Sequence, residues 1–155
     1  MFLTLQTAFC STIARRRYDK HRGIGIDMVV IPTFVVQSKQ VWPSTNYSVK
    51  AGDRIVVTWL SGEWSANPAW GILVNGNGNP SFPSAKTGYA MPGQPEGALV
   101  GKVGNSVFLV GNTAVVPANL AGTLYLAIND DVNGTYGAGY TDNIGALKVM
   151  IFKEN

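Results

Sequence analysis

Short apolar runs separated by turn residues follow one another along most of the chain. One run, 123–128, alternates between apolar and other residues and places Leu124, Leu126 and Ile128 on one face of a strand. Such runs are typical of an all-β protein, and their number and spacing predict a jelly-roll-like β-sandwich of about eight antiparallel strands. The expected strands are 29–31, 34–37, 46–49, 54–60, 98–103, 107–110, 113–116, 123–128 and 146–152.

Between two of these strands, residues 61–97 carry many turn signals and no regular pattern. A stretch of this length without regular structure is usually functional or disordered. Its four aromatic residues argue against disorder, and they are Trp64, Trp70, Phe82 and Tyr89. We assign Trp42 and Trp59, which lie outside the stretch, to the core.

The composition supports this fold class and bounds the function. Charged residues make up 14%, while the chain contains 18 glycines and 8 prolines, as in a turn-rich β protein. Residues 28–155 contain seven basic and seven acidic side chains, so they have no basic stripe, and we expect no nucleic-acid partner. No run of about 18 apolar residues is present, and we expect no membrane insertion.

The first 27 residues differ from the rest. They carry the net positive charge, and their basic residues follow the apolar stretch, which is the reverse of a secretory signal. We therefore predict a disordered N-terminal extension over residues 1–27 and a single domain over 28–155. Without a clear signal peptide, the expected location is the cytoplasm or, after a non-classical route, outside the cell.

Two scarce residue types exclude several chemistries. Cys10 is the only cysteine and His21 the only histidine, and both lie in the extension. The predicted domain therefore has no thiolate zinc site, no disulfide and no histidine-based triad. We expect a binding module and not an enzyme.

The loop 129–145 joins the last two expected strands and concentrates oxygen-bearing side chains. It contains three of the seven acidic residues of the domain, and no Lys or Arg lies between Lys102 and Lys148. Calcium takes six to eight oxygen ligands from carboxylates, amides and backbone carbonyls, and such a loop without a cation would repel itself. The alternative is a solvated hairpin whose Asp and Asn residues only stabilise turns.

At this loop the sequence resembles a known family. The segments that carry the resemblance are Gly122-Thr123-Leu124-Tyr125-Leu126-Ala127-Ile128-Asn129-Asp130, Gly134-Thr135-Tyr136-Gly137 and Asp142-Asn143-Ile144-Gly145, with Ala98 to Asn105 upstream. The chain resembles the LecA-type (PA-IL-like) bacterial galactose-binding lectins. This resemblance implies a galactose-binding-domain-like jelly roll with one calcium ion that binds two vicinal sugar hydroxyls.

The resemblance also implies a ligand set. The side-chain ligands would be Asp130, Asp142 and Asn143, and two further ligands would be backbone carbonyls, one near Asn67 and one in the loop. This loop is about five residues longer than in the family, so the second carbonyl is assigned to Thr135 by the motif or to Gly139 by counting back. Asp131 is either an extra ligand or part of the inserted residues.

One departure concerns the sugar. Galactose specificity in the family relies on a His and a Gln in the middle loop, and here that loop has no His and only Gln94. We expect sugar contacts from Asp130, Asp142, Tyr136 and Tyr140, with a galactose-type sugar as one candidate.

Three functional alternatives follow. The first is a calcium-dependent carbohydrate-binding lectin, and the second is a calcium-stabilised structural or interaction domain without sugar binding. The third is a glycoside hydrolase that would use Glu63 and Glu96, the remaining loop carboxylates. The family resemblance further implies a homo-oligomer, in which several weak sites gain avidity.

Overall fold

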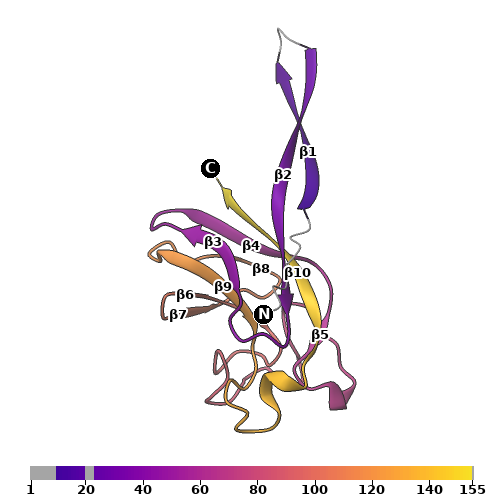
Figure 1. Ribbon diagram of the computed structural model, residues 1–155, viewed down its shortest axis with the longest axis vertical. Helices are drawn as coiled ribbons and strands as arrows, with labels where there is room; N and C mark the ends of the chain where they lie inside the picture. The colour runs from indigo at the N-terminus through magenta and orange to yellow at the C-terminus, as the bar shows by residue number, and fades with distance from the viewer. Residues whose placement is uncertain (1–9, 20–22, 155) are drawn as a thin grey trace, which may run out of the picture.

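The computed structural model describes residues 10–19 and 23–154, which form two antiparallel β-sheets (Figure 1). Two short 3-10 turns, η1 (Pro68–Trp70) and η2 (Gly139–Thr141), interrupt the connections. The strands of the described residues are β1 (Cys10–Asp19), β2 (Gly23–Gln37), β3 (Ser44–Val49), β4 (Arg54–Ser61), β5 (Trp64–Ser65), β6 (Leu99–Val103), β7 (Ser106–Leu109), β8 (Thr113–Val115), β9 (Gly122–Ile128) and β10 (Ile144–Glu154).

One sheet has the strand order β1-β2-β10-β4-β8, with β5 paired to β10, and the other has the order β3-β9-β6-β7. Strand β10 is the centre of the larger sheet, because it pairs with β2, β4 and β5. Every paired strand is antiparallel, so the predicted all-β, two-sheet sandwich is confirmed.

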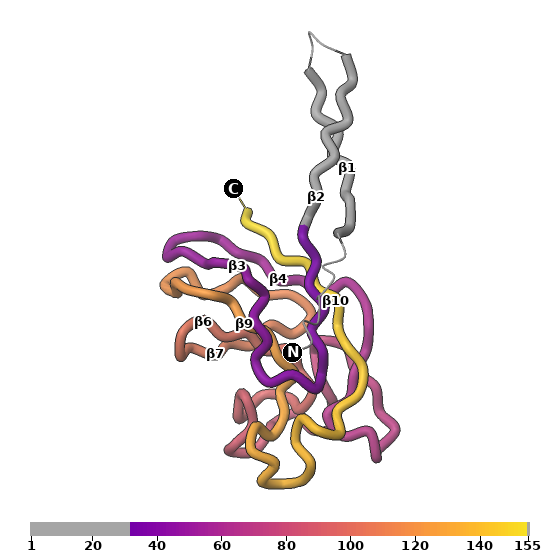
Figure 2. Tube along the Cα trace, in the orientation of Figure 1, coloured from indigo at the N-terminus to yellow at the C-terminus, as the bar shows by residue number. Residues whose placement is uncertain are grey.

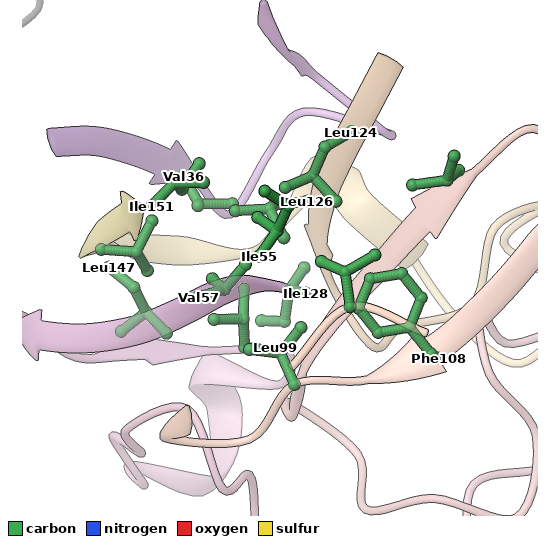
Figure 3. Close-up of a cluster of buried hydrophobic side chains, with 14 of the residues drawn as sticks. Val36, Ile55, Val57, Leu99, Phe108, Leu124, Leu126, Ile128, Leu147 and Ile151 are labelled. Carbon is green, nitrogen blue, oxygen red and sulfur yellow. The ribbon is translucent and has the colours of Figure 1, made fainter. Parts of the chain in front are cut away.

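The core lies between the two sheets and contains apolar side chains from both (Figure 3). Leu124, Leu126 and Ile128 are fully buried, as their alternation along β9 predicts. They pack in one cluster with Ile55 from β4 and Leu147 from β10. Burial of each such side chain contributes about 1.5–3 kcal/mol, so this cluster is a main source of the sandwich's stability.

Two details differ from the sequence prediction. Residues 29–37 belong to one continuous strand instead of two segments divided at Pro32. The ladder between β2 and β10 begins at Thr33, so Pro32 lies outside it and its missing N–H costs no bond to β10.

The assignment of tryptophans to the core is also partly wrong. Trp59 is half-buried and packs against the core cluster, as expected. Trp42 is half-buried without being part of that cluster, and Lys102 Nζ lies 4.7 Å from its ring centroid. Trp64, which lies in the loop-rich stretch, is instead fully buried and donates its indole N–H to Gly97 O at 2.7 Å. A tryptophan therefore anchors the middle segment to the sandwich.

The connections between β5 and β6 and between β9 and β10 lie together at one end of the sandwich (Figure 2). This end contains the candidate site. Residues 1–9 and 20–22 lie outside the described residues, and the N-terminal extension over residues 1–27 stays a prediction. Among the described residues, no helix has the length and apolar character needed to span a membrane.

Candidate functional site

The loop 129–145 is buried where it leaves β9 and has an exposed middle, and near its end Asn143 is buried between exposed neighbours. Asn129, Asp130 and Asp131 at its start and Asn143 near its end are buried, whereas 132–138 are exposed. The loop therefore brings polar side chains from its two ends into the end of the sandwich, where each needs a partner.

Two oxygens at this place have no partner. Asp130 Oδ2 and Asn143 Oδ1 are buried and accept no hydrogen bond from the described residues. The other atoms of these two side chains are used, because Asp130 Oδ1 accepts the N–H of Asp131 at 2.7 Å and Asn143 Nδ2 donates to Ser38 O at 3.1 Å. Leaving a buried acceptor unsatisfied costs about 1–3 kcal/mol, and a cation would satisfy both oxygens at once.

The raised pKa of Asp130 also favours a cation at this place. Burial, together with the negative charges of Glu96 and Asp142, raises the pKa of Asp130 to about 6. The N–H of Asp131 and the side chain of Asn143 oppose this shift only in part. A carboxylate that is desolvated among other carboxylates is stabilised in its charged form by a nearby metal ion.

The donor set that surrounds these oxygens fits calcium better than a transition metal. The described residues contain no group of three or more His, Cys, Asp or Glu side chains that could hold a metal. A cation at this place would depend on Asp130, on the Asn143 amide and on backbone oxygens, with Asp142 as the second predicted carboxylate. Such an all-oxygen set suits a hard cation such as Ca²⁺.

The other predicted metal ligands, Asp142, Asn67 and Thr135, have fewer recorded interactions with Asp130 and Asn143. Asp142 is exposed, but its charge acts on Asp130, so the two carboxylates are near one another. Asn67 precedes η1, and its carbonyl accepts the N–H of Trp70 at 3.1 Å. Thr135 lies in the exposed part of the loop, and no hydrogen bond of the described residues joins it or Asn67 to Asp130.

Asp131, whose role the sequence leaves open, folds the inserted residues. Its Oδ1 accepts the N–H of Asn133 at 3.2 Å, and its Oδ2 accepts the N–H of Tyr136 at 2.6 Å. A Cβ at Gly139 would lie 2.6 Å from Asp131 O, so the turn closes tightly against this residue. Both carboxylate oxygens of Asp131 are thus occupied by backbone donors.

The two tyrosines that we expected to contact sugar have different surroundings. Tyr136 is 51% exposed, and Lys86 Nζ lies 4.7 Å from its ring centroid. Tyr140 is 5% exposed, belongs to the core cluster and donates its hydroxyl proton to Ile128 O. Only the ring of Tyr136 is therefore open to a ligand in this arrangement.

Asn129 has a role that the sequence reading missed. Its Nδ2 lies 3.0–3.2 Å from the carbonyls of Met91, Gln94 and Pro95, and its Oδ1 accepts the N–H of Met91 at 2.8 Å. From the sequence, Asn129 is one of the oxygen-bearing side chains of the loop 129–145 that could serve calcium. Its position directly after a strand and before Asp130 was the available signal, but an amide at that position serves a metal or the backbone equally well.

Backbone bonds strengthen this connection between the two loops. The N–H of Ala90 donates to Asp130 O at 2.9 Å, and the N–H of Val132 donates to Gly88 O at 3.0 Å. Gly97 N–H donates to Asn129 O at 2.8 Å. The middle loop and the loop after β9 are therefore one hydrogen-bonded unit at the end of the sandwich.

The carboxylates of the third alternative do not form a pair. Glu63 is exposed beside β5, whereas Glu96 is 5% exposed and lines a small cavity with residues such as Trp70 and Asn79. Glu63 is not among the residues that line this cavity. The glycosidase alternative, which needs two carboxylates facing one bond, therefore has no support from this geometry.

Comparisons with known proteins agree with the fold. The family model described as PA-IL-like protein matches residues 38–155, well over half of the chain. A solved structure described as the EclA N-terminal domain, a PllA-like lectin, is similar with a TM-score of 0.52 and 23% identity, covering 79% of this chain and 95% of that one. A search of curated proteins found no match. The chain therefore belongs to the PA-IL-like family, a family of lectins and not of enzymes.

Proposed function

We propose that this protein is a calcium-dependent, carbohydrate-binding lectin. The side-chain ligands of Ca²⁺ would be Asp130, Asp142 and Asn143, with backbone carbonyls near Asn67 and in the loop, at Thr135 or Gly139, completing the set. The carrying observation is the pair of buried, unpartnered oxygens, Asp130 Oδ2 and Asn143 Oδ1. The bound ion would supply positive charge to the loop and a Lewis-acidic anchor for sugar hydroxyls.

The chain's own residues prepare this site. Asn129 bonds the segment around Met91 to the loop 129–145, and Asp131 fixes the turn between Asn133 and Tyr136. Neither segment therefore has to be ordered by the ligand. The exposed ring of Tyr136 offers an apolar face beside the loop, on which the C–H groups of a sugar can pack. Preorganisation of this kind lowers the entropic cost of binding.

Calcium titration by calorimetry tests the metal site. Asp130→Ala should abolish calcium binding, because it removes the buried carboxylate and leaves the Asn143 oxygen alone. Asp53→Ala is the matched control, since Asp53 pairs with Lys153 outside this loop. Calcium affinity that is unchanged in Asp130→Ala would show that the ion, if it binds, binds elsewhere.

The second candidate function is a calcium-stabilised interaction domain without sugar binding. The absence of His from residues 61–97 and the burial of Tyr140 favour it, because both reduce the groups available to a sugar. A glycan array probed in calcium and again in a chelator separates the two functions. The lectin proposal requires glycan signals that disappear in the chelator, and a calcium-binding protein without any signal would support the second function.

We infer homo-oligomerisation from the family resemblance alone, because separate weak sites gain avidity when they are linked.

A further inference from the structure

A small cavity lies beside the candidate calcium site, between η1 and the segment that leads into β6. Its walls include Asn67, Trp70, Ile72, Asn79 and Glu96. The space of about 10 Å³ accepts one group of the size of a water molecule. The cavity therefore selects by size as well as by chemistry.

Glu96 supplies the only acidic group among the described residues that line this cavity, and the fold holds it in place. Its N–H donates to Phe82 O at 2.9 Å, and its carbonyl accepts the N–H of Asn79 at 2.7 Å. Its Oε2 accepts the hydroxyl of Tyr89 at 2.8 Å. The second oxygen, Oε1, has no hydrogen-bond partner among the described residues, although the residue is only 5% exposed.

No basic side chain neutralises Glu96 within the described part of the chain. The ion pairs there are Arg54 with Glu154 and Lys153 with Asp53. A desolvated carboxylate with a free oxygen is unfavourable by itself and gains most from a cationic donor, since charge-assisted hydrogen bonds are the stronger kind.

Hydrogen bonds join the chain around Glu96 to the loop that carries the proposed metal ligands. Gly97, the residue after Glu96, donates its N–H to Asn129 O, and Pro95 accepts from the Asn129 amide at 3.0 Å. The negative charge of Glu96 is also felt by the Asp130 carboxyl. The Glu96 carboxylate therefore lies in the same part of the site as the carboxylate of Asp130.

We propose that Glu96 is a specificity-determining residue that receives the protonated amino group of an amino sugar in this cavity. The inference rests on the proposed lectin function and names its substrate class. An ammonium group is close to water in size and can donate to Oε1, which has no other partner. An N-acetylated amine is neutral and larger, so the cavity excludes it.

Calorimetric titration of the full-length, calcium-loaded protein with galactosamine, galactose and N-acetylgalactosamine at pH 6 tests the proposal. Galactosamine should bind about tenfold more tightly than galactose, because an ammonium–carboxylate pair replaces a hydrogen bond from a neutral hydroxyl to the carboxylate. N-acetylgalactosamine should bind no better than galactose. In Glu96→Gln the preference for galactosamine should disappear. Glu154→Gln, which neutralises a surface carboxylate paired with Arg54, should keep it.

Calcium binding and thermal melting are measured for each variant, so that a lost metal site or a misfolded chain is recognised. The three-sugar comparison on the unmodified chain does not depend on the folding of a variant. Equal affinities for galactosamine and galactose, or a preference that survives in a folded Glu96→Gln, would overturn this inference and leave the lectin proposal intact. Failure of calcium-loaded protein to bind any of these sugars or any glycan on the array would overturn both.

Discussion

In the absence of calcium, burial of the Asp130 carboxyl should make the protein less stable as pH rises. The pKa of this group is raised to about 6 in the folded protein from an ordinary value of 3.8, first because of burial and then because of the charges of Glu96 and Asp142. The folded state therefore binds the proton more tightly than the unfolded state. The resulting stability is fully present below about pH 4 and is lost as pH rises through about 6.

The size of this effect follows from the same values. At about 1.4 kcal/mol for each pH unit, the difference between the two pKa values corresponds to about 3 kcal/mol. The group is 4% exposed, so solvent screening reduces this figure little. Since domains are stable by about 5–15 kcal/mol, the loss between pH 4 and 7 is a large fraction of the total.

Urea denaturation followed by tryptophan fluorescence, to which the buried Trp64 contributes, measures this dependence. Wild-type protein and Asp130→Asn are compared in calcium-free buffer between pH 4 and 7, and the difference between them isolates Asp130 from the other carboxyl groups. The lowered pKa of Asp53 acts below its ordinary value of 3.8, outside this range. The wild-type free energy of unfolding should fall with pH, and that of Asp130→Asn should stay nearly level.

Calcium should reverse the trend, because the ion binds the ionised carboxylate and stabilises the folded state by about 2.7 kcal/mol at a hundred times its Kd. Asp53→Asn is the control and should retain the wild-type slope between pH 4 and 7. Identical slopes for wild type and Asp130→Asn in calcium-free buffer would refute the reasoning that burial of this carboxyl destabilises the empty site.

Two further substitutions test how the site is held. Asn129→Ala removes the amide that bonds to Met91, Gln94 and Pro95, so it should lower the free energy of unfolding by about 2–4 kcal/mol. It should also weaken calcium binding, and denaturation and calorimetry measure the two effects. Unchanged stability would mean that solvent replaces these bonds. Gly145→Ala places a Cβ against Glu63 O at a φ of +85°, so it should cost more than 1 kcal/mol and shift the β5–β10 pairing, which amide exchange would report.

The strands and the core could be predicted because both depend on local patterns. The alternation of Leu124, Leu126 and Ile128 determines which face of β9 is buried, whatever the rest of the chain does. Trp64 could not be placed in this way, because its burial depends on the carbonyl of Gly97, 33 residues away. The role of a residue within an irregular segment is a property of the tertiary structure.

The same limit applies to the candidate site. Asp130 Oδ2 and Asn143 Oδ1 have no hydrogen-bond partner among the described residues, as an assignment to a metal requires. Asn129 and Asp131 have the same chemistry, but backbone groups occupy their polar atoms. Nothing in the sequence distinguishes an amide or carboxylate that faces a metal from one that faces the main chain. Glu96 shows the same difficulty, since the sequence suggested a catalytic partner of Glu63, whereas the fold buries Glu96 and gives it the hydroxyl of Tyr89 as a donor.

The way in which Asp131 closes the inserted turn has a consequence for protein engineering. Residues 132–138 are exposed, and the carboxylate of Asp131 ties their beginning to Tyr136 without using the core. Foreign peptides or affinity tags inserted at Gly137, where an added Cβ meets nothing within 4 Å, would be displayed at the rim of the binding face without disturbing the sandwich. Residues 132–138 are thus a suitable insertion site for engineered variants of this lectin.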